Sequence, residues 1–182
     1  MERLFVGVAI SDEVRQGLVD HLAGTVGERG LPGRAVPPAS WHLTLRFLGD
    51  TDPKDAERLR AELRAAPLAV AFEMGFGQMG AFPRAARASV VWVGVESGAC
   101  ALRALAAEVE RAAVRAGFAA EPRPFAPHLT LSRVQPPRDV SAVLRAIPPF
   151  RARMRVDSVV LFRSRLGAGP PRYEAVETFP LR

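Results

Sequence analysis

The spacing of hydrophobic residues along the chain predicts alternating strands and helices. Apolar side chains recur every three or four residues in several stretches, and residues that commonly begin helices precede some of them, among them Ser11 and the pair Asp52–Pro53. Shorter runs that are rich in apolar residues predict strands. The helical stripes cover residues 14–22, 56–63, 102–113 and 140–147, and the expected strands are residues 4–10, 41–48, 68–76, 89–95, 128–134, 150–162 and 172–179.

Glycine and proline mark where these elements should end. Gly49 is expected to stop the strand at 41–48, and the composition of residues 77–87 is typical of a turn. Pro136 and Pro137 should break the strand that begins at His128. A loop rich in glycine and proline should join the last two strands.

One four-residue phrase, His-Leu-Thr-Leu, occurs on two of these expected strands, beginning at His42 and again at His128. Alternate side chains of an extended strand share a face. Each histidine should therefore lie beside its own threonine, Thr44 or Thr130, while the leucines face the other way. Such a strand suits a hydrophobic core on one face and a polar site on the other.

The elements around the two phrases follow the same order, and the spacing from Leu4 to His42 equals that from Val90 to His128. We interpret this as an internal duplication. The chain should form a single bilobal α+β domain, residues 1–182, from two intertwined units of approximately 1–87 and 88–182. We expect pseudo-two-fold symmetry, with two mainly antiparallel sheets flanking a cleft and helices on the outer faces.

Composition narrows the class of protein. The 182 residues are 48% hydrophobic, enough for a packed core, and no apolar run approaches the roughly 20 residues that span a membrane. The first residues lack the features of a signal peptide. Cys100 is the only cysteine, which excludes an internal disulfide. We therefore expect a cytoplasmic protein without a membrane partner, and we expect it to be a monomer.

The net charge of +6, with arginine far outnumbering lysine, fits an anionic substrate such as RNA. The same composition is equally typical of a protein from a GC-rich genome. Charge alone therefore does not decide the function.

Two histidines and two threonines that converge on a cleft can perform acid–base chemistry. Imidazole, with an ordinary pKa of about 6.5, gives or takes protons near neutral pH, so that one ring can act as acid while the other acts as base. Threonine hydroxyls can donate hydrogen bonds to phosphate oxygens. A strained cyclic phosphate would need no metal for attack by water or by a ribose hydroxyl.

Other interpretations are weaker. A single such phrase is more often an ordinary buried histidine, but two phrases at matched positions favour a site. The chain has no His-x-x-x-His pair, no Gly-x-Ser-x-Gly nucleophile motif and no glycine-rich phosphate loop with lysine.

Several further residues are candidates for substrate contacts. Strand periodicity places Arg46 on the face of His42 and nominally places Arg133 on the opposite face from His128. Arg163 lies at the end of an expected strand and could reach a phosphate. Phe125 and Phe47 flank the two phrases and could stack on a base.

Together these residues resemble the two-histidine phosphoesterase superfamily, in particular its RNA 2',3'-cyclic phosphodiesterase branch, also called 2'-5' RNA ligase-like proteins. The resemblance covers nearly the whole chain. Its motifs lie in residues 3–6, 41–49, 91–95, 123–133 and 161–164.

The resemblance implies hydrolysis of RNA 2',3'-cyclic phosphate ends to 2'-phosphates without metal or cofactor. His42 corresponds to the proton donor for the leaving 3' oxygen, and His128 to the proton acceptor from water. Thr44 and Thr130 would hold the phosphate. The resemblance also makes Arg133 a phosphate contact, which requires an irregular strand end.

Two alternatives stay open. Some members of the family join RNA through a 2'-5' bond, which reverses the reaction with the same residues. The chain could also be a binding module for nucleotides or RNA ends that does not turn them over. The residues alone permit the opposite assignment of acid and base.

Overall fold

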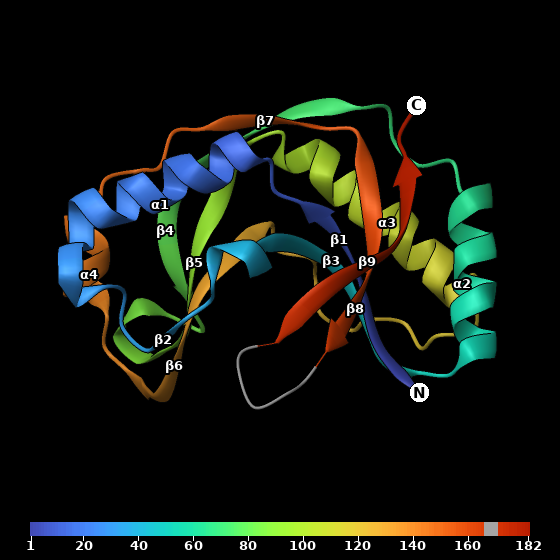
Figure 1. Ribbon diagram of the computed structural model, residues 1–182, viewed down its shortest axis with the longest axis horizontal. Coiled ribbons are helices and arrows are strands. Elements are labelled where there is room, and N and C mark those ends of the chain that lie inside the picture. Colours follow the sequence, from blue (N-terminus) through green and yellow to red (C-terminus); the bar gives the residue numbers. More distant parts are fainter. Residues whose placement is uncertain (166–170) are drawn as a thin grey trace.

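The computed structural model describes residues 1–165 and 171–182, and in these residues nine strands form one curved antiparallel sheet (Figure 1). The strand order is β7-β4-β5-β6-β3-β1-β8-β9, and β2 pairs with β6 beside this path. The strands are β1 Glu2–Ala9, β2 Arg34–Ala35, β3 His42–Thr51, β4 Phe72–Phe82, β5 Ala88–Ser97, β6 His128–Arg138, β7 Arg153–Val156, β8 Ser158–Arg165 and β9 Arg172–Pro180.

The expectation of two sheets needs correction, because β3 and β6 pair with each other at Leu43 and Leu129 and so join all strands into one sheet. This pair divides the sheet into two lobes. The His42 lobe comprises β3, β1, β8 and β9, and the His128 lobe comprises β6, β5, β4, β7 and β2. The class, α+β with antiparallel strands, is as expected.

The first and third helices cover the lobe opposite to that of the strand that precedes them. The helices are α1 Asp12–Val26, α2 Pro53–Ala65, α3 Ala99–Arg115 and α4 Ser141–Ala146, with short 3-10 turns at Gly27–Arg29, Pro38–Ser40 and Ala85–Arg87. In Figure 1, α1 follows β1 yet lies with α4 beside β4 and β5, whereas α3 follows β5 and lies on the side of β3. Each lobe is therefore covered by a helix that belongs to a strand of the other lobe.

Local sequence accounts for the starts of the first two helices. The Ser11 hydroxyl accepts a hydrogen bond from the Val14 amide at 3.3 Å, and the Asp52 carboxylate accepts two from the first turn of α2. These bonds satisfy amides that have no partner within the helix. Both predicted starts are confirmed.

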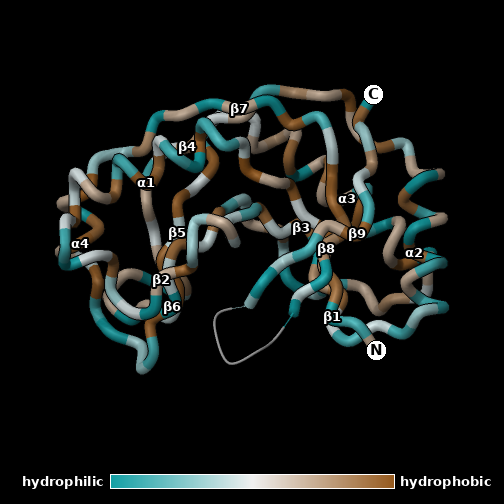
Figure 2. Tube along the Cα trace, viewed as in Figure 1, coloured by the Kyte–Doolittle hydropathy of each residue, from teal (hydrophilic) through white to brown (hydrophobic). Residues whose placement is uncertain are grey.

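The core lies between the sheet and the helices, where Figure 2 shows mostly hydrophobic strand segments. The predicted stripe of α3 is fully buried, and so are the leucines that follow the two histidines. The buried residues in question are Leu102, Leu105, Val109, Ala113, Leu43 and Leu129.

Several predicted boundaries are wrong. β3 continues through Gly49, whose φ of 75° bends the strand without ending it, and β4 continues through the expected turn to Phe82. β6 runs through Pro136 and Pro137 because its pairing with β5 steps over them, from Arg133 to Arg138. Residues 150–162 form parts of two strands that separate at Asp157.

The glycine- and proline-rich loop expected before β9 lies largely at 166–170, outside the described residues. Among the described helices, none is both long and apolar enough to cross a membrane.

Candidate active site

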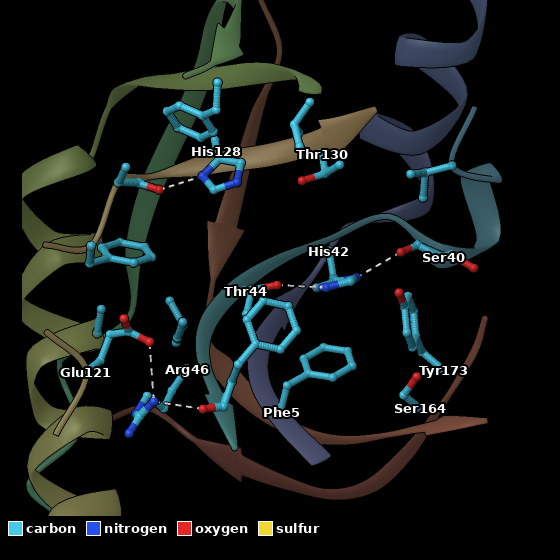
Figure 3. A pocket seen from close by; sticks show the side chains of 18 of the residues that line it. Phe5, Ser40, His42, Thr44, Arg46, Glu121, His128, Thr130, Ser164 and Tyr173 are labelled. Atoms are coloured by element: carbon cyan, nitrogen blue, oxygen red, sulfur yellow. Dashed lines mark hydrogen bonds and ion pairs between the residues drawn. The ribbon is translucent and has the colours of Figure 1, made fainter. Parts of the chain in front are cut away.

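The two phrases meet at the centre of the sheet. Because β3 and β6 are antiparallel and Leu43 pairs with Leu129, His42 lies beside Thr130 and Thr44 lies beside His128. Figure 3 shows this arrangement, with His128 and Thr130 on one strand and His42 and Thr44 on the next. The two histidines therefore occupy opposite corners of a four-residue polar patch.

This patch lines a cleft with a volume of about 1080 Å³. The paired leucines beneath it are completely buried, so they hold the two strands against the core while the polar side chains face the cleft. Each strand thus has its leucine on the core face and its histidine and threonine on the cleft face, as the sequence pattern predicts.

The imidazole of His42 is held on both of its nitrogens. Nδ1 lies 2.8 Å from the Ser40 carbonyl, which can only accept, so Nδ1 carries the hydrogen and donates it. Nε2 then accepts from the Thr44 hydroxyl at 2.9 Å. Phe5 and Tyr173 flank the ring, with centroids at 4.6 Å and 4.9 Å.

The imidazole of His128 is held on one side only. Its Nδ1 donates to the Ala126 carbonyl at 2.7 Å, and Nε2 has no hydrogen-bond partner among the described residues. Phe82 meets the ring edge-on with a centroid distance of 4.9 Å. The lone pair on Nε2 is therefore available to a molecule in the cleft.

Both rings are neutral at pH 7. Burial lowers the pKa of His42 to about 4, and nearby positive charge on Arg133 adds to this, whereas the hydrogen bond to Ser40 opposes it. Burial also lowers the pKa of His128, against the effect of its bond to Ala126. A neutral imidazole with Nδ1 protonated presents Nε2 as a base.

A β-bulge brings Arg133 to the cleft. The pairs Trp92–Thr130 and Val91–Ser132 leave Leu131 as an extra residue on β6. Side-chain alternation shifts by one position there, so Leu131 and Ser132 are both buried and Arg133 is exposed in the cleft wall. Simple alternation from His128 misplaces Arg133, whereas the irregular strand implied by the family resemblance is present.

β3 has the matching bulge. The pairs Val6–Arg46 and Gly7–Thr44 leave Leu45 as an extra residue, the equivalent of Leu131. The position equivalent to Arg133 is therefore Phe47, which lines the cleft and is 54% exposed.

Arg46 lies in the cleft wall, but carboxylates occupy its guanidinium. Its Nε is 2.5 Å from Glu110 and its Nη1 is 3.6 Å from Glu121, and the side chain is only 10% exposed. Arg163 is similarly bound, with Glu2 at 2.6 Å. Neither guanidinium is a free cation for substrate.

Phe125 lines the cleft and also packs against the core. Phe5, Tyr173 and Arg34 are cleft residues that the sequence interpretation missed. Phe5 and Tyr173 reach His42 from β1 and β9, and Arg34 reaches β6 from a two-residue strand. These contacts depend on strand order, which no local pattern reveals.

Two histidine–threonine pairs on adjacent strands of a curved antiparallel sheet, with an exposed arginine beside them, can perform acid–base chemistry on an anion. The comparison with protein families agrees with this class. The model of the 2'-5' RNA ligase superfamily matches residues 12–168, and the chain belongs to this family.

Individual relatives are similar over much of their length. The curated RNA 2',3'-cyclic phosphodiesterase of Aeropyrum pernix is 35% identical over 134 residues, which cover 72% of this chain and 74% of the relative. The solved structure of TT0787 from Thermus thermophilus is 30% identical, with a TM-score of 0.79 over 99% of this chain and 98% of that one. The structure of E. coli LigT complexed with 3'-AMP is 26% identical, with a TM-score of 0.79 and the same coverage.

Proposed function

We propose that the chain is an RNA 2',3'-cyclic phosphodiesterase that opens the cyclic phosphate to a 2'-phosphate. The observation that carries this proposal is the antiparallel pair Leu43–Leu129, which sets two histidine–threonine pairs against each other on one cleft. Curated relatives from Aeropyrum pernix and Escherichia coli are RNA 2',3'-cyclic phosphodiesterases, which supports the choice of substrate.

The geometry favours His128 as the base. Its Nε2 has a lone pair with no partner among the described residues, so it can take a proton from the attacking water. The water oxygen bonds to phosphorus, the bond from phosphorus to the 3' oxygen breaks, and His42 gives its Nε2 proton to that oxygen. The different partners of the two rings support this assignment.

His42 must gain a proton before it can act as acid. Its pKa of about 4 keeps it neutral in the free protein. An anionic phosphate close to the ring favours the imidazolium and raises this pKa, because opposite charges stabilise each other. Substrate binding would thus protonate His42. The hydroxyls of Thr44 and Thr130 and the guanidinium of Arg133 would hold the phosphate oxygens.

Replacement of either histidine tests this proposal. His42→Ala and His128→Ala should each lower the hydrolysis rate of an oligonucleotide with a 2',3'-cyclic phosphate end by about 10²- to 10⁴-fold. His21→Ala is the matched control, since His21 bonds the Pro148 carbonyl outside the cleft. Wild-type rates in both cleft variants would refute the proposal, and the product should be the 2'-phosphate.

Joining of RNA through a 2'-5' bond is the second candidate, favoured by the name of the matched family. It would use the same groups with a 5'-hydroxyl as the leaving or attacking group. Incubation of two RNA halves, one with a cyclic phosphate and one with a 5'-hydroxyl, separates ligation from hydrolysis. A third possibility, binding without turnover, predicts a stable complex and no product.

We also infer that the fold arose by internal duplication, with units of approximately 1–87 and 88–182 in a single bilobal domain. Equivalent leucines pair across the centre, and both strands carry a bulge one residue after the threonine, which supports this inference. The cytoplasmic location and the monomeric state stay predictions from the sequence.

A further inference from the structure

Two arginines lie side by side on the cleft wall beyond the histidine–threonine patch. Arg34 of β2 is in register with Arg133 of β6, and residues in direct register on antiparallel strands have Cβ atoms about 4.5–5.5 Å apart. Both side chains are exposed and both line the cleft. The pair lies on the Thr130 side of the patch.

The backbone fixes the position of Arg34. The Ser132 hydroxyl donates to the Pro32 carbonyl at 2.7 Å, and the Val36 amide donates to the Leu131 carbonyl at 2.8 Å. Between these bonds, Gly33 has a φ of 87°, and a Cβ there would lie 2.3 Å from the Arg133 carbonyl oxygen. Only glycine permits this close approach, so the loop holds Arg34 against Arg133.

This arrangement is unfavourable without a ligand. Like charges directly opposite each other on a sheet destabilise it. Within residues 1–165 and 171–182, no carboxylate forms an ion pair with either guanidinium. Arg46 and Arg123 in the same cleft have acidic partners, whereas Arg3 and Arg103, which lie apart from this pair, have none in the described residues. The unpaired charges of Arg34 and Arg133 therefore face the space that substrate would occupy.

We propose that Arg34 binds a second phosphate of the substrate, the phosphodiester that precedes the terminal nucleotide. This inference rests on the proposed function. A cyclic phosphodiester carries a single negative charge, which Arg133 alone neutralises, so the second cation matches a second anion. Arg34 is then a specificity residue that makes the site prefer an RNA end to a free cyclic mononucleotide.

The test compares a cyclic mononucleotide with a dinucleotide that ends in the same cyclic nucleotide. Arg34→Ala should lower kcat/KM for the dinucleotide by about tenfold, as expected for loss of one charged hydrogen bond, and leave the mononucleotide unaffected. Arg34→Lys should retain most of the activity because it keeps the charge. Arg29→Ala, an exposed arginine outside the cleft, is the matched control.

Binding of the corresponding 2'-phosphate products, measured by calorimetry, tests Arg34 independently of turnover. In the Arg34→Ala variant the dinucleotide product should bind more weakly, and the slope of its affinity against salt should fall by about 0.7, the value for one phosphate contact on a single strand. An equal loss on mononucleotide and dinucleotide, or no loss on the dinucleotide, would overturn the proposal. If the wild-type protein hydrolyses neither substrate, the proposed function fails and these binding data still decide the role of Arg34.

Discussion

The two walls of the cleft have the same backbone but different chemistry. Each begins with a histidine and a threonine, and each carries a bulge at the next residue. Five residues after the histidine, the His42 wall presents Phe47 and the His128 wall presents Arg133. Aromatic rings flank both histidines, Phe5 and Tyr173 at His42 and Phe82 at His128, whereas the exposed cations Arg133 and Arg34 lie in register along β6 and its partner β2.

Two walls with the same backbone pattern can therefore hold an asymmetric substrate. The shared elements supply two imidazoles that are alike in their bonds to backbone carbonyls. The divergent positions supply an aromatic surface on one side, suited to a nucleobase, and positive charge on the other, suited to phosphate. In the proposed mechanism, the orientation of the substrate gives the two histidines different tasks.

Lowering the pH should destabilise the protein, and the largest contribution should come from His42, on the more enclosed wall. The pKa of His42 falls from 6.5 in the unfolded chain to about 4 in the folded one, so between these values the unfolded state binds the extra proton. The free energy of unfolding should therefore decrease as the pH drops from 6.5 to 4, by about 3 kcal/mol from this ring. Urea unfolding of wild type and His42→Gln measures the effect.

The Gln variant should lose most of this pH dependence. The lowered pKa of His128 acts in the same direction, so a residual slope should remain. If the unfolding free energy of wild type and of His42→Gln depended on pH in the same way, the pKa of His42 would be normal and its ring would not be enclosed.

Removal of the cation from the His128 wall should have the next largest effect. Arg133→Ala should lower kcat/KM on a cyclic phosphate by about 10- to 100-fold, because a charged hydrogen bond to the phosphate is lost. It should also raise the pKa of His42, since the charge of Arg133 lowers it. Steady-state kinetics and an NMR titration of the His42 ring measure the two effects.

The control for Arg133 is Arg138→Ala on the same strand, outside the cleft lining. An unchanged pKa of His42 in Arg133→Ala would contradict the electrostatic link between the two walls.

Removal of the aromatic side chain of Phe47, at the position equivalent to Arg133, should have a smaller effect, on KM rather than on kcat. Phe47→Ala should raise KM for a nucleotide by about tenfold with little change in kcat, because stacking on one base is lost. Phe47→Tyr should restore binding, since it keeps the ring. A fall in kcat with unchanged KM would place the base elsewhere.

Chelation of metal ions should leave the turnover of a cyclic phosphate unchanged. Among the described residues, no group of three histidine, cysteine, aspartate or glutamate side chains is arranged as metal ligands would be. Two imidazoles and a strained cyclic phosphate suffice for the proposed mechanism, so turnover of a cyclic phosphate should be the same before and after dialysis against EDTA. A loss of activity that added metal restores would contradict the metal-independent mechanism.

The sequence revealed the parts of this structure that depend on local pattern. Alternation and the repeated phrase placed the histidines and threonines correctly on two strands, and the caps at Ser11 and Asp52 located two helices. The bulges at Leu45 and Leu131 were invisible to alternation, because they depend on the register with neighbouring strands.

Long-range pairing explains the other differences. The structure has one sheet instead of the two expected because Leu43 pairs with Leu129, and the sequence of neither strand alone indicates this pairing. Simple alternation predicts Arg46 on the face of His42, but the bulge at Leu45 shifts that alternation, and Glu110 on α3 and Glu121 engage the guanidinium after folding. Contacts of this kind follow from strand order and helix packing rather than from spacing along the chain.

If His42 and His128 form one site with divided tasks, the pH dependence of kcat on a 2',3'-cyclic phosphate should show it. Wild type should give a bell-shaped profile, because the base must be neutral and the acid protonated. In the residual activity, His128→Ala should lack the rise on the acidic side and His42→Ala should lack the fall on the alkaline side. Loss of the same limb in both variants, or a flat wild-type profile, would contradict the division of tasks.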